Sequence, residues 1–420
     1  MVFPETDLDG QPPHDDLRGA VLGRPQLTWL AESLPVVVDR ALPRPREARG
    51  DWMSRLHQMW GETWIPSISL GTRARLVREQ RFELDAAQLY ALDLLTESER
   101  VLLQGGAGSG KTLLAAEAAR RHAAAGRSVL FLCFTQPLRR WLESRLQPDG
   151  VEVETVSGIS KRLADSTGQS VQAADLTNSG TWRVIYERAV DAARPEWDVV
   201  IVDEAQDLPE EAWFVVEALA RGRRLLGFHD PYQGFWKDRR PPPELFPVSQ
   251  RLPRGKRCPP GVEALAALYA GQPAEETAIG KAMRDRVLAL VPCHADQVGE
   301  AVGTEIDRLL SQHVRLEDIG VVSLRGQTAL DAVHRRPRLG RHEFVHADAL
   351  EAEERLVADS FLRWKGLERP VIVVADVEPE LKALGTRMHI ALTRALAGAR
   401  VVAPPAPGGE WPGLPSAPAS

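Results

Sequence analysis

Short apolar runs recur along this 420-residue chain, and each run is followed by a stretch with helical spacing or loop composition. Such alternation predicts a parallel sheet that helices cover on both faces. In the first block the expected strands are Val101–Leu103, Val129–Phe134, Val151–Val156, Val199–Val202 and Leu225–Phe228. A second block follows near residue 255, with expected strands Val287–Val291, Ile319–Val322, Glu343–Val345, Val371–Val374 and Arg400–Val402. Between these strands the spacing predicts helices such as Glu300–Leu310 and Met388–Ala397.

The pattern divides the chain into two α/β lobes and three flanking segments. We expect the first lobe at 81–250, with a small insertion at about 157–197, and the second lobe at 251–402. Residues 1–20 and the Pro/Gly-rich tail 403–420 are predicted to be disordered, and 21–80 to form a small, mainly helical accessory region. Four tryptophans in that region fit either packing onto the next domain or a partner-binding surface: Trp29, Trp52, Trp60 and Trp64.

A glycine-rich loop stands between the first expected strand and a helical stretch, in the run VLLQGGAGSGKT at Val101–Thr112. Glycines let backbone N–H groups turn inward around a phosphate, and a helix N-terminus adds positive potential. Lys111 can reach the outer phosphates and the Thr112 hydroxyl can hold Mg²⁺. The loop therefore predicts a nucleoside triphosphate site formed by Gly105, Gly106, Ala107, Gly108, Ser109, Gly110, Lys111 and Thr112.

A second chemical signal is DVVIVDEAQDL at Asp198–Leu208, where a buried strand runs directly into acidic residues. Asp203 at the end of such a strand can hold Mg²⁺ together with Thr112. The adjacent Glu204 can orient or deprotonate an attacking water. Taken alone, the acidic run also fits a strand-to-helix cap, but together with the phosphate loop it indicates nucleotide hydrolysis.

Composition sets limits on the class of protein. The net charge of −6 argues against a generally basic nucleic-acid coat, although local basic clusters such as Arg251–Arg257 remain. The three cysteines are scattered singly, so neither a disulfide framework nor a Cys-based zinc site is indicated. No apolar run approaches about 20 residues and no signal segment follows Met1, so we expect a cytoplasmic protein with no membrane partner.

The phosphate loop followed by DEAQD resembles the UvrD/Rep-like branch of superfamily 1 DNA helicases, whose core is two RecA-like P-loop NTPase lobes. Further motifs follow in that family's order between residues 82 and 402. Phe82–Gln88 resembles the Q motif, which implies that Gln88 reads the adenine edge. His229–Trp236 resembles motif III, which implies that Gln233 senses the γ-phosphate.

The second block carries the remaining motifs. Arg257 fits the motif IV arginine, and Trp364–Glu368 resembles motif V, which implies that Gly366 and Glu368 lie near the phosphates and ribose. Ala391–Ala395 resembles motif VI, which implies that Arg394 is an arginine finger. Arginines presented across a cleft can stabilise charge on the γ-phosphate only when the lobes close.

Leu132–Leu138 resembles motif Ia, and Thr155 lies where the family has a further strand-contacting threonine. Aromatic side chains are sequence-tolerant stacking platforms because every base has a π-face, although core packing explains each of them equally well. The predicted nucleic-acid contacts are Phe134, Thr135, Thr155, Phe235, Trp236 and Trp364.

Some positions depart from the family pattern. Lys256 replaces the aromatic residue that sandwiches adenine, which puts nucleobase selectivity in doubt, and Ser157 replaces a strand-contacting histidine. Motif V has Ser360 and Leu362 in place of threonine and histidine. The short spacing between Thr155 and Asp203 also indicates that large inserted subdomains are reduced or missing.

These observations predict an ATP- and Mg²⁺-dependent, nucleic-acid-stimulated ATPase that translocates on single-stranded DNA. The resemblance implies 3′-to-5′ polarity, RNA is not excluded as the nucleic acid, and the N-terminal region is a candidate surface for a protein partner. An alternative is an ATP-driven switch that clamps DNA or a partner without unwinding, which the altered strand-contact motifs favour. A phosphoryl-transfer kinase using the same loop is disfavoured by DEAQD followed by Arg394.

Overall fold

The computed structural model describes residues 69–79, 86–168, 179–236, 238–253, 257–405 and 411–414. Residues 68–420 form one compact unit, which contains both lobes. The predictions for 1–20, for most of 21–80, for Lys256 and for the start of the Q motif lie outside the described residues.

The first lobe (86–253) is built on a six-stranded sheet in the order β3-β2-β4-β5-β1-β6, and its strand pairs are parallel. Its strands are β1 (Arg100–Gln104), β2 (Val129–Cys133), β3 (Glu152–Thr155), β4 (Val199–Val202), β5 (Arg224–His229) and β6 (Val248–Arg251). The first five match the predicted strands. The edge strand β6 was not predicted, because its sequence VSQR is mostly exposed and carries no apolar pattern.

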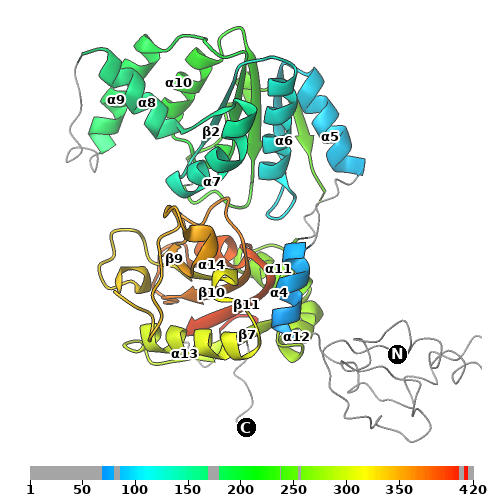
Figure 1. The fold of residues 1–420 in the computed structure, drawn as a ribbon, viewed down its shortest axis with the longest axis vertical. Coiled ribbons are helices and arrows are strands. Elements are labelled where there is room, and N and C mark those ends of the chain that lie inside the picture. Colours follow the sequence, from blue (N-terminus) through cyan, green and yellow to red (C-terminus); the bar gives the residue numbers. More distant parts are fainter. Residues whose placement is uncertain are drawn as a thin grey trace, which may run out of the picture. The chain divides into compact units, whose positions relative to one another are not determined.

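Helices cover both faces of this sheet (Figure 1). In β2, Val129 and Phe131 face one core and Leu130 and Leu132 face the other, as the two-residue period of a strand requires. The first core is completed by α5 (Ala86–Glu97), α6 (Lys111–Ala124) and α7 (Gln136–Leu146). The second is completed by α8 (Val156–Ser166), α9 (Ser179–Ala192) and α10 (Glu210–Leu219). The predicted insertion at 157–197 therefore holds, in its described part, α8 and α9 packed against this face.

The second lobe is built on a five-stranded sheet in the order β7-β11-β10-β8-β9, again with parallel pairs. Its strands are β7 (Leu288–Pro292), β8 (Ile319–Ser323), β9 (Val357–Ser360), β10 (Arg369–Ala375) and β11 (Ala395–Ala403). One face packs on α11 (Pro260–Tyr269), α12 (Glu276–Arg284) and α14 (Leu384–Leu392). The other packs on α13 (Val298–Ser311) and α4 (Leu70–Glu79). Two parallel sheets flanked by helices confirm the predicted α/β class, consistent with two RecA-like lobes.

Single 3₁₀ turns complete the described elements. They are η3 (Gln147–Asp149), η5 (Ala205–Asp207), η6 (Pro243–Leu245), η7 (Leu316–Asp318), η8 (Val333–Arg335) and η9 (Ala352–Glu354). None of the described helices is both long and apolar enough to cross a bilayer.

Three predictions in and after the second lobe were wrong. The strand expected at Glu343–Val345 is replaced by β9, with which Val345 forms only an isolated bridge. The helix expected at Met388–Ala397 stops at Leu392, because the next residues enter the sheet as β11. The tail is ordered at Trp411–Leu414, where both named side chains are buried in the second-lobe core and Trp411 Nε1 donates to the Pro404 carbonyl over 2.8 Å.

Helix α4 is the described part of the predicted accessory region 21–80, and it belongs to the second lobe instead of packing on the domain that follows it. Leu70 is buried against β10 and β11 and lies next to Gly398. Gly71 lies so close to the Gln312 carbonyl that a Cβ there would be 2.3 Å from its oxygen. The chain therefore contributes one helix to the second lobe before it enters the first.

Candidate nucleotide site between the lobes

The phosphate loop spans Gly105–Gly110 between β1 and α6. Gly108 and Gly110 have φ of +68° and +87°, a conformation that favours glycine. A Cβ at Gly105 would lie 2.4 Å from Ser109 Oγ, and one at Gly110 would lie 2.8 Å from Gln88 Nε2. The loop is therefore a backbone cradle that side chains would fill, as a phosphate site requires.

Lys111 begins α6 and is held inside this cradle. Its Nζ donates to the carbonyls of Gly105 and Gly106 over 2.9 and 2.8 Å, and lies 3.1 Å from Asp230 Oδ2. Burial alone raises the pKa of Asp230, but the Lys111 charge and a hydrogen bond from the Tyr232 N–H bring it below its usual value. The ion pair positions the ammonium beside the loop, where phosphates can take over as its partners.

Asp230 was not among the predicted site residues. It directly follows β5, the strand that pairs with β1, so it occupies the same edge of the sheet as Asp203, which directly follows β4. The rule that identified Asp203, an acid at the carboxyl end of a buried parallel strand, could also have found Asp230.

Asp203 is fully buried, and its two oxygens differ. Oδ1 accepts from the Glu204 N–H over 2.9 Å, whereas Oδ2 has no hydrogen-bond partner among the described residues. Burial and the nearby Glu204 charge raise the pKa of Asp203 to about 7, against a hydrogen bond from the Thr112 hydroxyl. An orphaned carboxylate oxygen beside a hydroxyl matches the oxygen ligands that Mg²⁺ takes, so these two residues fit the predicted metal site.

Glu204 has a φ of +54°, which is uncommon for a residue with a side chain. The Gln206 amide donates to Glu204 Oε2 and accepts from the Asp230 N–H over 2.9 Å, so Gln206 links the two acids. Gln233 Oε1 is buried without a partner in the described part of the chain. Strained backbone and orphaned polar atoms of this kind gather where a ligand completes a site.

The second lobe contributes two arginines. Arg257 Nη1 lies 2.7 Å from Glu368 Oε2, and its Cβ would be 3.4 Å from a Cβ at Gly108. Arg394 is 4% exposed, and its Nε donates to the Ile390 carbonyl over 3.1 Å. Both guanidiniums are thus oriented by neighbours in their own lobe.

Both lobes contribute to one cavity of about 270 Å³, whose lining includes Lys111, Glu204 and both arginines but not Asp203 or Asp230. Of the predicted residues, the cavity brings together Ala107, Gly108, Gly110, Lys111, Thr112, Glu204, Gln233, Arg257, Gly366, Glu368 and Arg394. Gln88 instead touches the loop, where its Nε2 donates to the Ser109 carbonyl over 3.0 Å. Lining residues that the sequence did not indicate are Val77, Arg78, Leu113, Trp141, Leu367, Arg369, Pro370 and Leu396. Leu367 lies within the predicted motif V segment. For the other seven no local motif marks the position, because their contribution depends on which segments fold together.

Direct contacts join the two lobes beside this cavity. Lys365 Nζ lies 2.6 Å from each carboxylate oxygen of Asp207 and donates to the Gln233 carbonyl over 2.7 Å. Gly366, with φ of +78°, lies against the Leu138 side chain. The segments that carry the site residues of one lobe are therefore packed directly against those of the other.

Three of the predicted nucleic-acid contacts form an aromatic cluster. The ring of Trp236 lies 5.5 Å from that of Phe134 and 5.2 Å from that of Phe235, both edge to face. Phe235 also meets Phe361 of the second lobe at 5.2 Å. The guanidinium of Arg239 lies 3.9 Å over the Trp236 ring and covers one of its faces.

Trp364 is a core residue, which corrects its prediction as a stacking platform. It is 0% exposed, its Nε1 donates to the Val321 carbonyl over 3.1 Å, and its ring lies under Gly320. A ring in this position cannot reach a base. Thr135 and Thr155 are also buried, and their hydroxyls cap α7 and α8 by accepting from backbone N–H groups.

Comparison with known families adds one finding. Residues 83–233 match a family model described as an AAA domain, which covers the first lobe from the Q-motif region to Gln233. The first lobe is a P-loop NTPase domain. The match supports a helicase-type P-loop superfamily and a nucleotide-dependent ATPase, without reaching the UvrD/Rep-like branch. No curated protein matches the chain.

Proposed function

We propose that this chain is a nucleic-acid-stimulated ATPase of the UvrD/Rep-like type that moves along single-stranded DNA. ATP hydrolysis between the lobes drives closing and opening, and the polarity expected from the resemblance is 3′ to 5′. The proposal is carried by one observation, the cavity in which the phosphate loop and Glu204 of the first lobe meet Arg257 and Arg394 of the second.

The roles of the residues follow from their positions. Lys111 would leave Asp230 to bind the outer phosphates, and Glu204 would accept the proton of the attacking water. Thr112 and Asp203 would hold Mg²⁺, which when bound neutralises charge on the phosphates. Arg394 would meet the charge that develops on the γ-phosphate.

Coupling to nucleic acid would use the contacts that join the lobes. Gln233 shares a short loop with Phe235 and Trp236, and its carbonyl accepts a hydrogen bond from Lys365 of the second lobe. A change at the γ-phosphate end of the cavity could therefore shift the aromatic cluster and the second lobe together. If each lobe grips a strand differently in the two states, the cycle becomes stepping.

A second candidate is an ATP-driven switch that clamps DNA or a partner protein without unwinding. The covered face of Trp236 favours it, because a base must displace the Arg239 guanidinium to stack there. The short segment that carries α8 and α9, in place of a large inserted subdomain, favours it as well.

The deciding experiment measures ATP hydrolysis with single-stranded DNA, duplex DNA and RNA, followed by strand displacement on a duplex with a 3′ single-stranded tail. A translocase is stimulated most by single strands and displaces the annealed strand from the 3′-tailed duplex alone. Stimulation without displacement selects the switch. ATP hydrolysis that no nucleic acid accelerates contradicts the translocase and a switch that clamps DNA, and leaves only a switch that clamps a partner protein.

A further inference from the structure

The cavity between the lobes has two chemically different parts. The loop, Glu204, Gln233 and the arginines supply polar groups suited to a triphosphate. The remaining wall comes from α4, α6, α7, β10, β11 and the turn before β10. Its apolar residues are Val77, Leu113, Trp141, Leu367, Pro370 and Leu396, and Arg78 and Arg369 lie among them. A nucleotide has the same division, with a charged phosphate end and a flat, weakly polar base.

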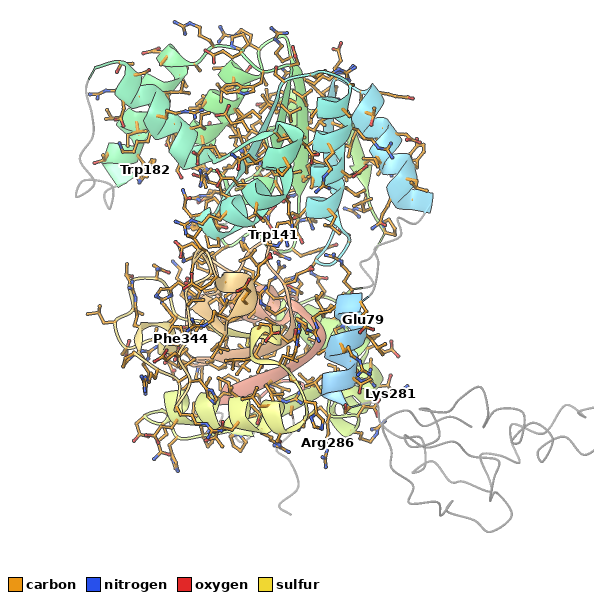
Figure 2. The ribbon with its side chains drawn as sticks, viewed as in Figure 1. Glu79, Trp141, Trp182, Lys281, Arg286 and Phe344 are labelled. Carbon is orange, nitrogen blue, oxygen red and sulfur yellow. The ribbon has the colours of Figure 1, made fainter. Side chains whose placement is uncertain are left out.

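Trp141 is the one aromatic side chain among the described residues that line this cavity. It lies on α7 and packs against the cores of both lobes, so its ring is placed at the boundary between them (Figure 2). The Arg145 guanidinium lies 4.2 Å from the centre of the ring, on one face. The ring is only partly buried, and Trp141 also lines the cavity.

The chemistry of the lining leaves the apolar wall to the base. The triphosphate is fixed by the loop, and its outer end must point to Glu204 and Gln233 for hydrolysis. Leu113 stands one residue after Thr112 on α6, outside the loop, and lines the cavity with Trp141. With the phosphate end at the loop, Glu204 and Gln233, the apolar wall that Leu113 and Trp141 line is the part of the cavity available to the nucleoside.

We infer that Trp141 is the stacking platform for the nucleobase of the bound nucleotide. This inference rests on the proposed function, because it needs a nucleotide in the cavity, and it deepens it by naming the base subsite. It also explains how the base could be held although Lys256 replaces the aromatic residue that stacks on adenine in the resembled family. In this chain the stacking ring would come from α7 instead. Since any purine offers a π-face, the platform serves ATP and GTP alike.

The test uses Trp141→Leu, which removes the ring but keeps apolar bulk, and Trp141→Phe, which keeps a ring. Binding is measured by calorimetry with two probes, Mg²⁺·ATP and Mg²⁺·tripolyphosphate, which has phosphates but no base. Trp141→Leu should weaken ATP binding about tenfold and leave tripolyphosphate binding unchanged, and Trp141→Phe should retain most of the affinity. Trp182→Leu on α9, which removes a tryptophan outside the cavity wall, is the matched control (Figure 2).

The outcomes distinguish an error in the base subsite from an error in the nucleotide site as a whole. Equal weakening of both probes would mean that the ring only supports the lobe boundary, and unchanged ATP binding would mean that the base lies elsewhere. Either result overturns the inference while leaving the ATPase in place. If Lys111→Ala weakens neither probe, the nucleotide site itself is wrong. If Trp141→Leu does not fold, the change in tryptophan fluorescence on ATP binding is measured instead. The inference expects this change to be lost in Trp141→Phe and kept in Trp182→Leu.

Discussion

Lys365 and Asp207 form a fully buried ion pair between the lobes, with Nζ 2.6 Å from both carboxylate oxygens and neither side chain exposed. Asp207 ends the DEAQD segment of the nucleotide site, and Lys365 precedes Gly366 in the second lobe. A buried pair of this kind is weak support for stability in itself, but breaking it leaves an uncompensated charge in the interior. The pair therefore makes the approach of the lobes depend on the charge state of Asp207.

Asp207→Asn should lower the free energy of unfolding by about 3–5 kcal/mol at pH 8, because Lys365 stays buried without its counter-charge. Burial outweighs the Lys365 charge and raises the pKa of Asp207 to about 6. A carboxyl whose pKa is raised on folding binds its proton more tightly in the folded chain, so its protonation favours the folded state at low pH. That contribution is lost as the pH rises through about 6.

The wild type loses this stabilisation as the pH rises from 5 to 8, whereas the asparagine variant has no carboxyl to titrate there. The cost of Asp207→Asn should therefore be larger at pH 5 than at pH 8. Urea unfolding at the two pH values measures the difference. Glu187→Gln, which removes an exposed partner of Arg183, is the control and should cost less than about 1 kcal/mol at both. An equal cost of Asp207→Asn at pH 5 and pH 8 contradicts the raised pKa of Asp207.

Gly366→Ala should slow ATP hydrolysis at least about tenfold by holding the lobes apart. The residue has φ of +78°, and a Cβ there would lie 2.5 Å from Leu138 Cδ2, inside the buried contact between the lobes. Gly222→Ala is a matched control, because Gly222 has φ of +67° with nothing within 4 Å of its Cβ position. Gly222→Ala introduces the backbone strain alone, about 1 kcal/mol, without a clash like that between the Gly366→Ala methyl group and Leu138.

If the clash with Leu138 causes the loss, the steady-state ATP hydrolysis rate of Gly222→Ala stays near that of the wild type. Adding Leu138→Ala to Gly366→Ala should then restore part of the lost rate by making room for the methyl group. Equal loss of rate in both glycine variants, with no rescue, would attribute the effect to backbone strain alone.

Glu204→Gln should reduce the ATP hydrolysis rate about 10²- to 10⁴-fold while ATP still binds, because the amide cannot accept the water proton. Lys111→Ala should instead weaken ATP binding, since it removes the cation held beside the loop. Single-turnover rates and calorimetric titration separate the two effects. Glu210→Gln, an exposed position on α10, is the control. ATPase rates that stay at the wild-type level in both site variants contradict the roles.

Trp236→Ala should weaken single-stranded DNA binding by about 1–3 kcal/mol if the ring stacks on a base. Arg239→Ala should strengthen binding or leave it unchanged, because it uncovers one face of that ring. Fluorescence anisotropy with a labelled oligonucleotide at fixed salt measures both. Trp182→Ala is the control for a tryptophan outside the aromatic cluster. If Trp236→Ala binds single-stranded DNA with unaltered affinity, Trp236 only packs within the protein and does not stack on a base.

Features whose signal lies within one segment could be predicted from the sequence. The phosphate loop, the acidic strand end at Asp203 and most strands are readable because a few consecutive residues carry both the pattern and the chemistry. β6 was missed and β9 misplaced for the same reason: an edge strand without an apolar pattern, and a strand inside a long irregular connection, carry no local signal.

Contacts between distant segments are visible only in the folded chain. The fold placed α4 on the second lobe, buried Trp364 beneath Gly320, paired Lys365 with Asp207 and brought Trp141 to the wall of the cavity. Each of these contacts depends on the mutual approach of surfaces that are far apart along the chain. Burial and charge compensation at such surfaces are properties of the assembled fold, and no window of sequence contains both partners.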